Sequence, residues 1–209
     1  MKMNKYLYYI FTAISFALLI AAPGRFAFGI IVCFELFFLL FVSFIFSFFT
    51  KKLHVEELNS IFTVIGLVFS TILYKQIIMW LFPLVALQMS FVFYLPAVSS
   101  YVIGIIYNNI NQSTKVSFIE NIKIVSTFTV FALIFYAIRD VFGYGTFTLP
   151  TASGLIENVI FETDSFSCAT ILASIPGALV LVSISILIFI FVQNKFKIIK
   201  RAGDSDDSK

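Results

Sequence analysis

The sequence has little charge and few of the side chains that carry out chemistry. Aspartate, glutamate, lysine and arginine make up only 12% of its 209 residues, whereas 60% are hydrophobic. This composition excludes a water-soluble globular domain. The single histidine, His54, lies in the polar stretch Lys-Lys-Leu-His-Val-Glu-Glu, where a surface position is favoured over metal binding or acid–base work.

Motifs for catalysis are missing as well. The sequence has no nucleophile–base arrangement, no phosphate-binding loop and no metal-binding motif, and nothing in it predicts binding of nucleic acid. Its two cysteines, Cys33 and Cys168, have no spacing that indicates a disulfide, so each is interpreted as a small buried apolar residue. The residues alone therefore do not predict an enzyme.

Long apolar runs rich in phenylalanine occupy most of the chain. Each has about 17 residues or more, enough to cross a hydrocarbon core roughly 30 Å thick. The runs predict an all-α integral membrane protein of about six transmembrane helices in one domain, residues 1–200. The predicted spans are residues 6–22, 26–49, 58–74, 77–107, 117–138 and 169–193.

The first run could also be a secretory signal peptide. Pro23, however, directly follows the only plausible small-residue cleavage site, Ala21-Ala22, and proline there is unfavourable for cleavage. A retained first helix is therefore predicted.

The basic residues predict the orientation of these spans. One side, which carries both termini, collects most of them: Lys2, Lys5, Lys51, Lys52, Lys115, Lys123, Lys195, Lys197, Lys200, Arg201 and Lys209. The other side has Arg25, Lys75 and Arg139. This bias predicts a multi-pass protein of the inner (cytoplasmic) membrane with cytoplasmic N- and C-termini. Residues 195–201 are interpreted as an anchor on anionic headgroups, and the acidic tail, residues 201–209, as disordered.

Gly143-Tyr144-Gly145 matches the tripeptide at the heart of potassium-channel selectivity filters. The preceding residues, Val141-Phe142, provide no hydroxyl at the base of such a filter. Residues 77–107, where a voltage-sensing span would lie, contain no arginine. The sequence thus argues against a potassium pore, and the glycines predict a sharp turn or re-entry after the fifth helix, with Thr146 bonding a freed backbone group.

Four motifs in this region occur in a specific order. They are Arg139-Asp140, Gly143-Tyr144-Gly145-Thr146, Glu162-Thr163-Asp164-Ser165 and Ile175-Pro176-Gly177-Ala178. In this order the chain resembles the Rnf/Nqr membrane-subunit family of the RnfE/NqrD type, whose members belong to ion-translocating electron-transport complexes. Within the third motif, Asp164 or Ser165 is predicted to cap the last helix.

The resemblance implies two inverted three-helix repeats, with the first and fourth helices broken at prolines. The two breaks correspond to residues 18–29 and 93–104. In the family they hold a 2Fe-2S cluster by one cysteine each, with two more from a sister membrane subunit of opposite topology. Here the corresponding positions, near Ala22 and near Ser100 and Tyr101, contain no cysteine. We therefore expect no cofactor bound by this chain alone, with Tyr101 filling part of the vacated volume.

Three charged residues within or beside the spans are candidates for an ion path. Glu35 lies inside the second span without a charged neighbour at helical spacing, and such a carboxylate suggests either ion handling or a protonated structural residue. Arg139 and Asp140 are predicted at the membrane edge, where each neutralises the other or extends outward. For this pair, structural anchoring and an ion path both remain open.

The favoured function is a membrane subunit of an Rnf/Nqr-type ion-translocating electron-transport complex, without iron–sulfur ligands of its own. Such a subunit need not be catalytic. Its partners would be the sister subunit, other Rnf/Nqr-type subunits and the lipid bilayer. The alternatives are a small-solute or ion transporter derived from the same scaffold, using Ser99, Ser100 and Tyr101, and a purely structural or assembly membrane protein.

The topology can be tested with single-cysteine variants. Because six spans place Lys209 in the cytoplasm and Asn158 in the loop before the last span, an impermeant thiol reagent should label cysteines at these two positions from opposite faces. Labelling of both from the same face would contradict the predicted orientation.

Overall fold

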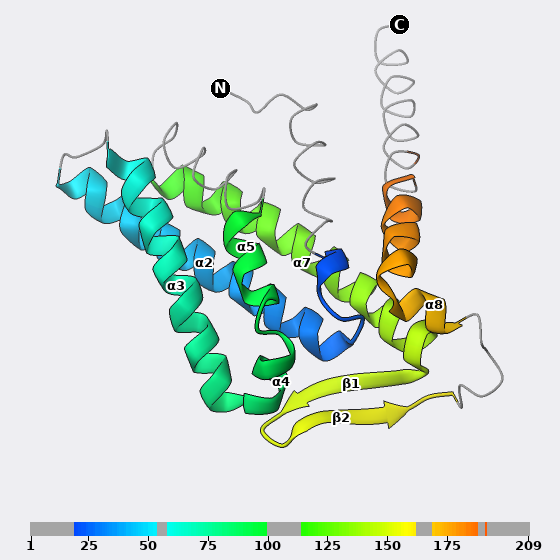
Figure 1. The fold of residues 1–209 in the computed structure, drawn as a ribbon. Helices are drawn as coiled ribbons and strands as arrows, with labels where there is room; N and C mark the ends of the chain where they lie inside the picture. Colours follow the sequence, from blue (N-terminus) through cyan, green and yellow to red (C-terminus); the bar gives the residue numbers. More distant parts are fainter. Residues whose placement is uncertain (1–18, 54–57, 100–113, 162–168, 188–190, 192–209) are drawn as a thin grey trace, which may run out of the picture.

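The protein, seen as a computed structural model, is mostly helical (Figure 1). The structure describes residues 19–53, 58–99, 114–161, 169–187 and 191. Three helices are long and apolar enough to cross a membrane: α2 (Phe26–Lys52), most of α3 (Asn59–Leu81) and most of α7 (Thr114–Tyr144). The shorter elements are α4 (Pro83–Gln88), η2 (Val92–Tyr94), α5 (Leu95–Val98), α8 (Ala169–Ala173) and a helix at Ile175–Leu187.

Parts of the predicted topology lie outside the described residues. These parts include most of the first span, residues 100–107 of the predicted fourth span and the end of the sixth. The described chain is a helical membrane protein, whereas six spans and an inverted repeat remain predictions. The predicted cap at Asp164 or Ser165 and the surface position of His54 also fall on residues that the structure does not describe.

Helix α2 is the centre of the fold, because α3 packs along one side of it and α7 along another (Figure 1). Large apolar side chains cover the outside of the bundle, among them Phe62, Phe69 and Trp80 of α3. Small polar residues of α2 and α3 are instead buried between the helices. This distribution is the reverse of that in a soluble protein and suits helices that face lipid, which interact through small and polar residues.

Two glycines let the long helices approach closely. A Cβ atom at Gly29 of α2 would lie 2.3 Å from Cδ2 of Tyr136 on α7, and one at Gly66 of α3 would lie 2.6 Å from Cε2 of Phe46 on α2. Both distances are far below van der Waals contact. The aromatic rings therefore pack directly on the backbone of the neighbouring helix.

The predicted position of the boundary between the third and fourth spans is wrong. Helix α3 continues through Lys75 to Leu81, so Lys75 lies within a helix and not in a loop; its ammonium donates to the Tyr94 hydroxyl at 3.3 Å. Pro83 then begins α4, because proline is tolerated in the first turn of a helix but not in its interior. The segment predicted as one broken span, residues 77–107, is consequently divided among the end of α3, α4, η2 and α5 in its described part.

A β-hairpin, which the sequence analysis did not predict, follows α7 in this mostly helical chain. Strand β1 (Thr146–Thr151) pairs in antiparallel fashion with β2 (Gly154–Val159), from Thr146 opposite Val159 to Thr151 opposite Gly154. Gly145 adopts a φ of 68°, a conformation that ends α7 and that glycine reaches without strain. The sharp turn predicted after the fifth helix is therefore confirmed, but it leads into a hairpin.

The two ends of the bundle differ in character. The hairpin, α4 and the start of α2 lie at one end in Figure 1, while the end of α2 and the start of α7 lie at the other. Lys51 and Lys52 form the last turn of α2, so the latter end, called here the basic end, carries positive charge. The hairpin end carries Arg25, paired with Glu157 of β2.

The close packing of α2 on α7 yields a prediction. Gly29→Ala should lower stability by about 1–3 kcal/mol, because the added methyl group overlaps the Tyr136 ring in a packed interior. Thermal unfolding in detergent would measure the loss, with the exposed position Phe34→Leu as the control. A combined Gly29→Ala and Tyr136→Leu variant should lose less than the two single losses together. Unchanged unfolding of Gly29→Ala would contradict this packing.

Candidate functional site

Arg139 lies near the C-terminal end of α7 and is buried, with 1% of its surface exposed. One terminal nitrogen donates to the carbonyl oxygens of Leu19 at 3.1 Å and Ala22 at 3.0 Å, and the other to the carbonyl oxygen of Ala173 at 3.0 Å. The guanidinium thus joins the segment before Pro23 to the end of α8. All three acceptors belong to the backbone.

These carbonyl groups need a partner because helices stop there. Residues 19–21 are helical, and the helix ends at Ala22, just before Pro23, which has no N–H group to donate. Helix α8 ends at Ala173, and Ser174 begins the next helix, where its hydroxyl accepts from the N–H of Gly177 at 3.5 Å. Carbonyl groups at a helix end carry partial negative charge, so a guanidinium with five donors suits this position.

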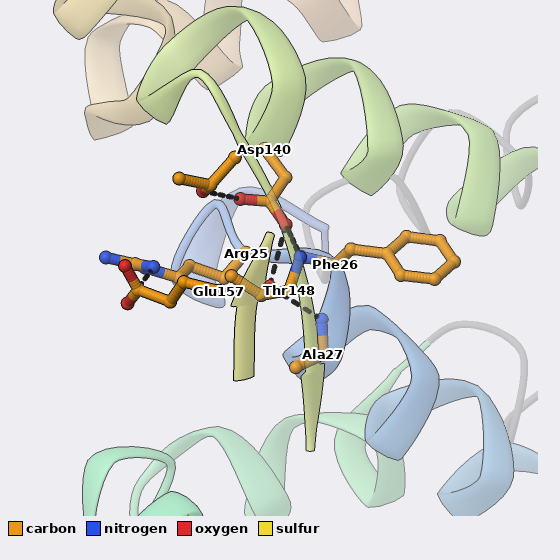
Figure 2. Close-up of polar contacts among 7 residues, drawn as sticks. Arg25, Phe26, Ala27, Asp140, Thr148 and Glu157 are labelled. Carbon is orange, nitrogen blue, oxygen red and sulfur yellow. Dashed lines mark hydrogen bonds and ion pairs between the residues drawn. The ribbon is translucent and has the colours of Figure 1, made fainter. Parts of the chain in front are cut away.

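Asp140, the next residue, binds the opposite side of the same chain break (Figure 2). Its Oδ2 accepts from the backbone N–H of Phe26 at 3.1 Å, in the first turn of α2, where Arg25 gives no side-chain cap. The same oxygen accepts from the N–H and the hydroxyl of Thr148, both at 2.7 Å. Oδ1 accepts from the Thr146 hydroxyl at 3.0 Å. Asp140 therefore caps α2 from another element.

Thr148 extends this cap by one residue. Its hydroxyl donates to Asp140 and accepts from the N–H of Ala27 at 3.3 Å (Figure 2). Two of the N–H groups that the start of α2 leaves without a helical partner are satisfied in this way. The negative carboxylate also lies at the positive end of the helix.

Arg139 and Asp140 consequently straddle the break between residues 19–22 and α2. The expectation that they neutralise each other or extend outward is not met: both are buried, and each binds backbone groups on its own side of the break. Consecutive helical residues point about 100° apart, which lets one pair of neighbours serve two directions. The arrangement holds two helix ends of opposite partial charge at a fixed separation.

An outer layer of contacts covers this buried pair. Arg25 forms an ion pair with Glu157 of β2 (Figure 2). Its guanidinium carbon also lies 4.5 Å from the centre of the Tyr144 ring. The centres of the Phe26 and Phe147 rings lie 4.5 Å apart. The hairpin is thereby fixed over the start of α2, and it shields the Asp140 contacts from water.

Protein groups fill the first break, where the resemblance predicts a vacated cluster position. Ala22 is 1% exposed and its carbonyl oxygen is bound by Arg139. A Cβ atom at Gly24 would lie 3.0 Å from Nε of Arg139, so the guanidinium fills the space at this turn. The hypothesis that Tyr101 fills the vacated volume falls on Ser100 and Tyr101, which lie outside the described residues.

No group of three or more potential metal ligands occurs among the residues that the structure describes. Cys33 is a buried free thiol on α2, with its sulfur 4.0 Å from the carbonyl oxygen of Thr129, as expected for a small buried residue. Cys168 is not among the described residues. At the second break, Ser99 donates its hydroxyl to the carbonyl oxygen of Pro96 at 2.6 Å.

Glu35 lies apart from this pair, in the middle of α2. It follows Phe26 by nine residues, or about 14 Å along a helix. The side chain is fully buried, and in the described part of the chain neither carboxyl oxygen has a hydrogen-bond partner. The nearby Tyr74 hydroxyl donates to the carbonyl oxygen of Ile31 at 2.8 Å and not to Glu35. The three charged candidates thus form two separate sites.

Sequence reasoning identified Arg139, Asp140 and Thr146, although the Thr146 hydroxyl donates to the Asp140 carboxylate and not to a freed backbone group as predicted. It missed Thr148 and the carbonyl oxygen of Ala173. Thr148 could have been found, because threonines six and eight residues after an aspartate recur on one face of a strand. Ala173 could not, since a backbone carbonyl has no signal in a sequence.

Comparisons with protein-family models, with curated proteins and with solved structures found no match to this chain. The resemblance to Rnf/Nqr subunits therefore remains a prediction from the motifs themselves.

At this end of the bundle, replacing the buried carboxylate of Asp140 should cost more stability than replacing the exposed carboxylate of Glu157. Asp140→Asn keeps the shape but removes the charge that four hydrogen bonds share, and it should cost about 1–3 kcal/mol of stability. Glu157→Gln breaks a partly exposed ion pair and should cost about 0–1 kcal/mol. Thermal unfolding of both variants in one detergent compares them directly, and equal losses would show that Asp140 does not act as the cap.

Proposed function

We propose that this chain is a membrane subunit of an ion-translocating electron-transport complex of the Rnf/Nqr type and that it binds no iron–sulfur cluster by itself. It would lie in the inner membrane, with its termini in the cytoplasm, beside a sister subunit of opposite topology. Its contribution would be to the packing of the complex or to the passage of the transported ion.

The observation that carries this proposal is that the first two motifs of the resemblance contact each other and bind the chain just before the fourth motif. Arg139-Asp140 from the first motif binds the carbonyl oxygen of Ala173, close before the Ile175-Pro176-Gly177-Ala178 motif. Thr146 from the glycine motif donates to Asp140. The same pair holds the first proline break at Ala22 and Phe26. Segments that are far apart in the sequence, and that carry or adjoin motifs of the family resemblance, thus meet at one site.

The lack of a cluster is consistent with this geometry. In a membrane interior, backbone groups at a helix break must find partners within the protein. Arg139 and Asp140 provide those partners at the first break, where family members have a cysteine ligand instead. The break can therefore persist without metal.

Glu35 favours a second candidate, a small-solute or ion transporter built on the same scaffold. A fully buried carboxyl group without a hydrogen-bond partner among the described residues is costly to keep, and inside a membrane such groups mark ion and proton paths. This reading needs no redox partner.

Co-isolation separates the two candidates. The tagged chain, expressed with its neighbouring genes, should retain through mild detergent a second membrane subunit whose helix breaks contain cysteines, and iron should appear only when that subunit is present. Asp140→Ala, which removes the cap on α2, should reduce this retention, whereas Glu157→Gln should not. Stoichiometric iron in the chain alone would contradict the predicted loss of ligands. Ion or solute flux by the chain alone in liposomes, without a bound partner, would favour the transporter.

A further inference from the structure

The buried face of α2 carries a line of polar side chains that make none of the hydrogen bonds at the break between residues 19–22 and α2. Glu35, Ser43, Ser47 and Thr50 are each at most 5% exposed, and their spacing of three, four or eight residues keeps them on one side of the helix. The line runs from the middle of α2 to its last turn at Lys51 and Lys52. It therefore connects Glu35 with the basic end of the bundle.

At the basic end, α3 and α7 add polar groups to this line. The Thr50 hydroxyl donates to Oδ1 of Asn59 at 2.6 Å, and the Thr63 hydroxyl approaches the same oxygen at 3.4 Å. On α7, buried Asn121 donates to the hydroxyl of Ser117 at 3.3 Å. Phe118 stacks on Phe44 with ring centres 4.4 Å apart, which places this part of α7 beside the same stretch of α2. Buried polar side chains of three helices thus lie toward this end of the bundle, and they are called here the polar cluster.

One member of this polar cluster has spare hydrogen-bonding capacity. The hydroxyl of Ser47 is buried and has no partner among the residues that the structure describes. A buried hydroxyl in this state costs free energy unless water reaches it. Water entering from the basic end would satisfy it.

A short apolar layer separates the polar cluster from Glu35. Leu39 lies one helical turn from Glu35 and one turn from Ser43, and it packs against Leu67 of α3 and Ala97 of α5. Leu39 and Leu67 are 0% and 2% exposed. Such a layer interrupts a continuous file of water while spanning only about one turn, or 5.4 Å.

The surroundings of Glu35 suit a proton better than a metal ion. A bound cation needs several oxygen ligands and is usually held by more than one carboxylate, but no group of three or more potential metal-binding side chains occurs in the described part of the chain. The titratable groups that interact with this region from the described elements are Tyr74 on α3 and Cys33 on α2, and neither is a cation. An uncharged carboxylic acid is the form that a dry, unpaired site accommodates.

We propose that Glu35 is a proton-carrying group reached from the basic end of the bundle through the polar cluster of α2, α3 and α7, with Leu39 and Leu67 as the barrier. This inference rests on the proposed ion-translocating function, which it narrows to protons at this site. Loading transfers a proton from hydronium in the water of the polar cluster to the Glu35 carboxylate and leaves a water molecule, and release transfers the proton back to water.

The first test is chemical. Dicyclohexylcarbodiimide, an apolar reagent that modifies protonated carboxyl groups within membranes, should label Glu35 of the full chain in lipid vesicles, and labelling should decline as the pH rises. Mass spectrometry locates the product. Glu35→Gln should abolish it, while Glu157→Gln, at an exposed carboxylate, should leave it unchanged. Absence of labelling at Glu35 at every pH would overturn the proposal.

The second test concerns the route. In a Cys33→Ala, Cys168→Ala background, Ser47→Cys should react with an impermeant thiol reagent from the face that carries Lys51 and Lys52, whereas the buried apolar control Leu40→Cys should not. Leu39→Ala should increase severalfold the reaction of Glu35 with a water-soluble carbodiimide from that face, and Ser47→Val should decrease it. Unfolding curves identify any variant that fails to fold.

The outcomes separate this inference from the proposed function. Unreactive Ser47→Cys with labelled Glu35 would overturn the route from the basic end. A co-isolated partner subunit with unlabelled Glu35 would overturn the proton carrier alone. Labelled Glu35 without any partner would overturn the electron-transport assignment and retain the proton carrier.

Discussion

The structure depends on one constraint, which is that a helix broken inside a membrane must satisfy its free backbone groups within the protein. Two neighbouring residues meet it at the first break. Arg139 takes the carbonyl groups that precede Pro23, and Asp140 takes an N–H group at the start of α2. Each charge faces the helix end of opposite partial charge, so the polar groups and the side chains neutralise one another. The hairpin and α8 are then held in place by the same pair.

A charged pair of this kind differs from a salt bridge. Both side chains are buried, yet their hydrogen bonds go mainly to the backbone, whereas Arg25 and Glu157 outside them form an ion pair. Arg139 retains one buried nitrogen, Nε, without a partner among the described residues. The break is thus a rigid element, in contrast to the isolated carboxyl group of Glu35, which nothing described holds in place. The many hydrogen bonds at the break and the carboxyl group of Glu35 without a described partner fit a fixed scaffold around a group that exchanges a proton.

Much of the helical framework could be predicted from the sequence. Apolar runs long enough to span lipid located α2 and α7 to within a few residues at each start, because hydrophobic length is a local property. The end of α3 could not be located in the same way. Its apolar run appeared to stop at Lys75, but a long ammonium side chain reaches the Tyr94 hydroxyl and allows the helix to continue to Leu81. The hairpin was hidden because six-residue strands between helices carry a weak signal.

The sequence by itself determined that this is a helical membrane protein, that its chain turns at Gly145, and that Glu35, Arg139 and Asp140 are the charges that need explanation. These conclusions follow from composition and from residue types whose cost in lipid is independent of the fold. Only the tertiary structure decided that Arg139 and Asp140 face opposite sides of one break and that Glu35 stands apart from them. Three of the partners of the pair, at Leu19, Ala22 and Phe26, are backbone groups more than a hundred residues away, and backbone groups are the same at every position of a sequence.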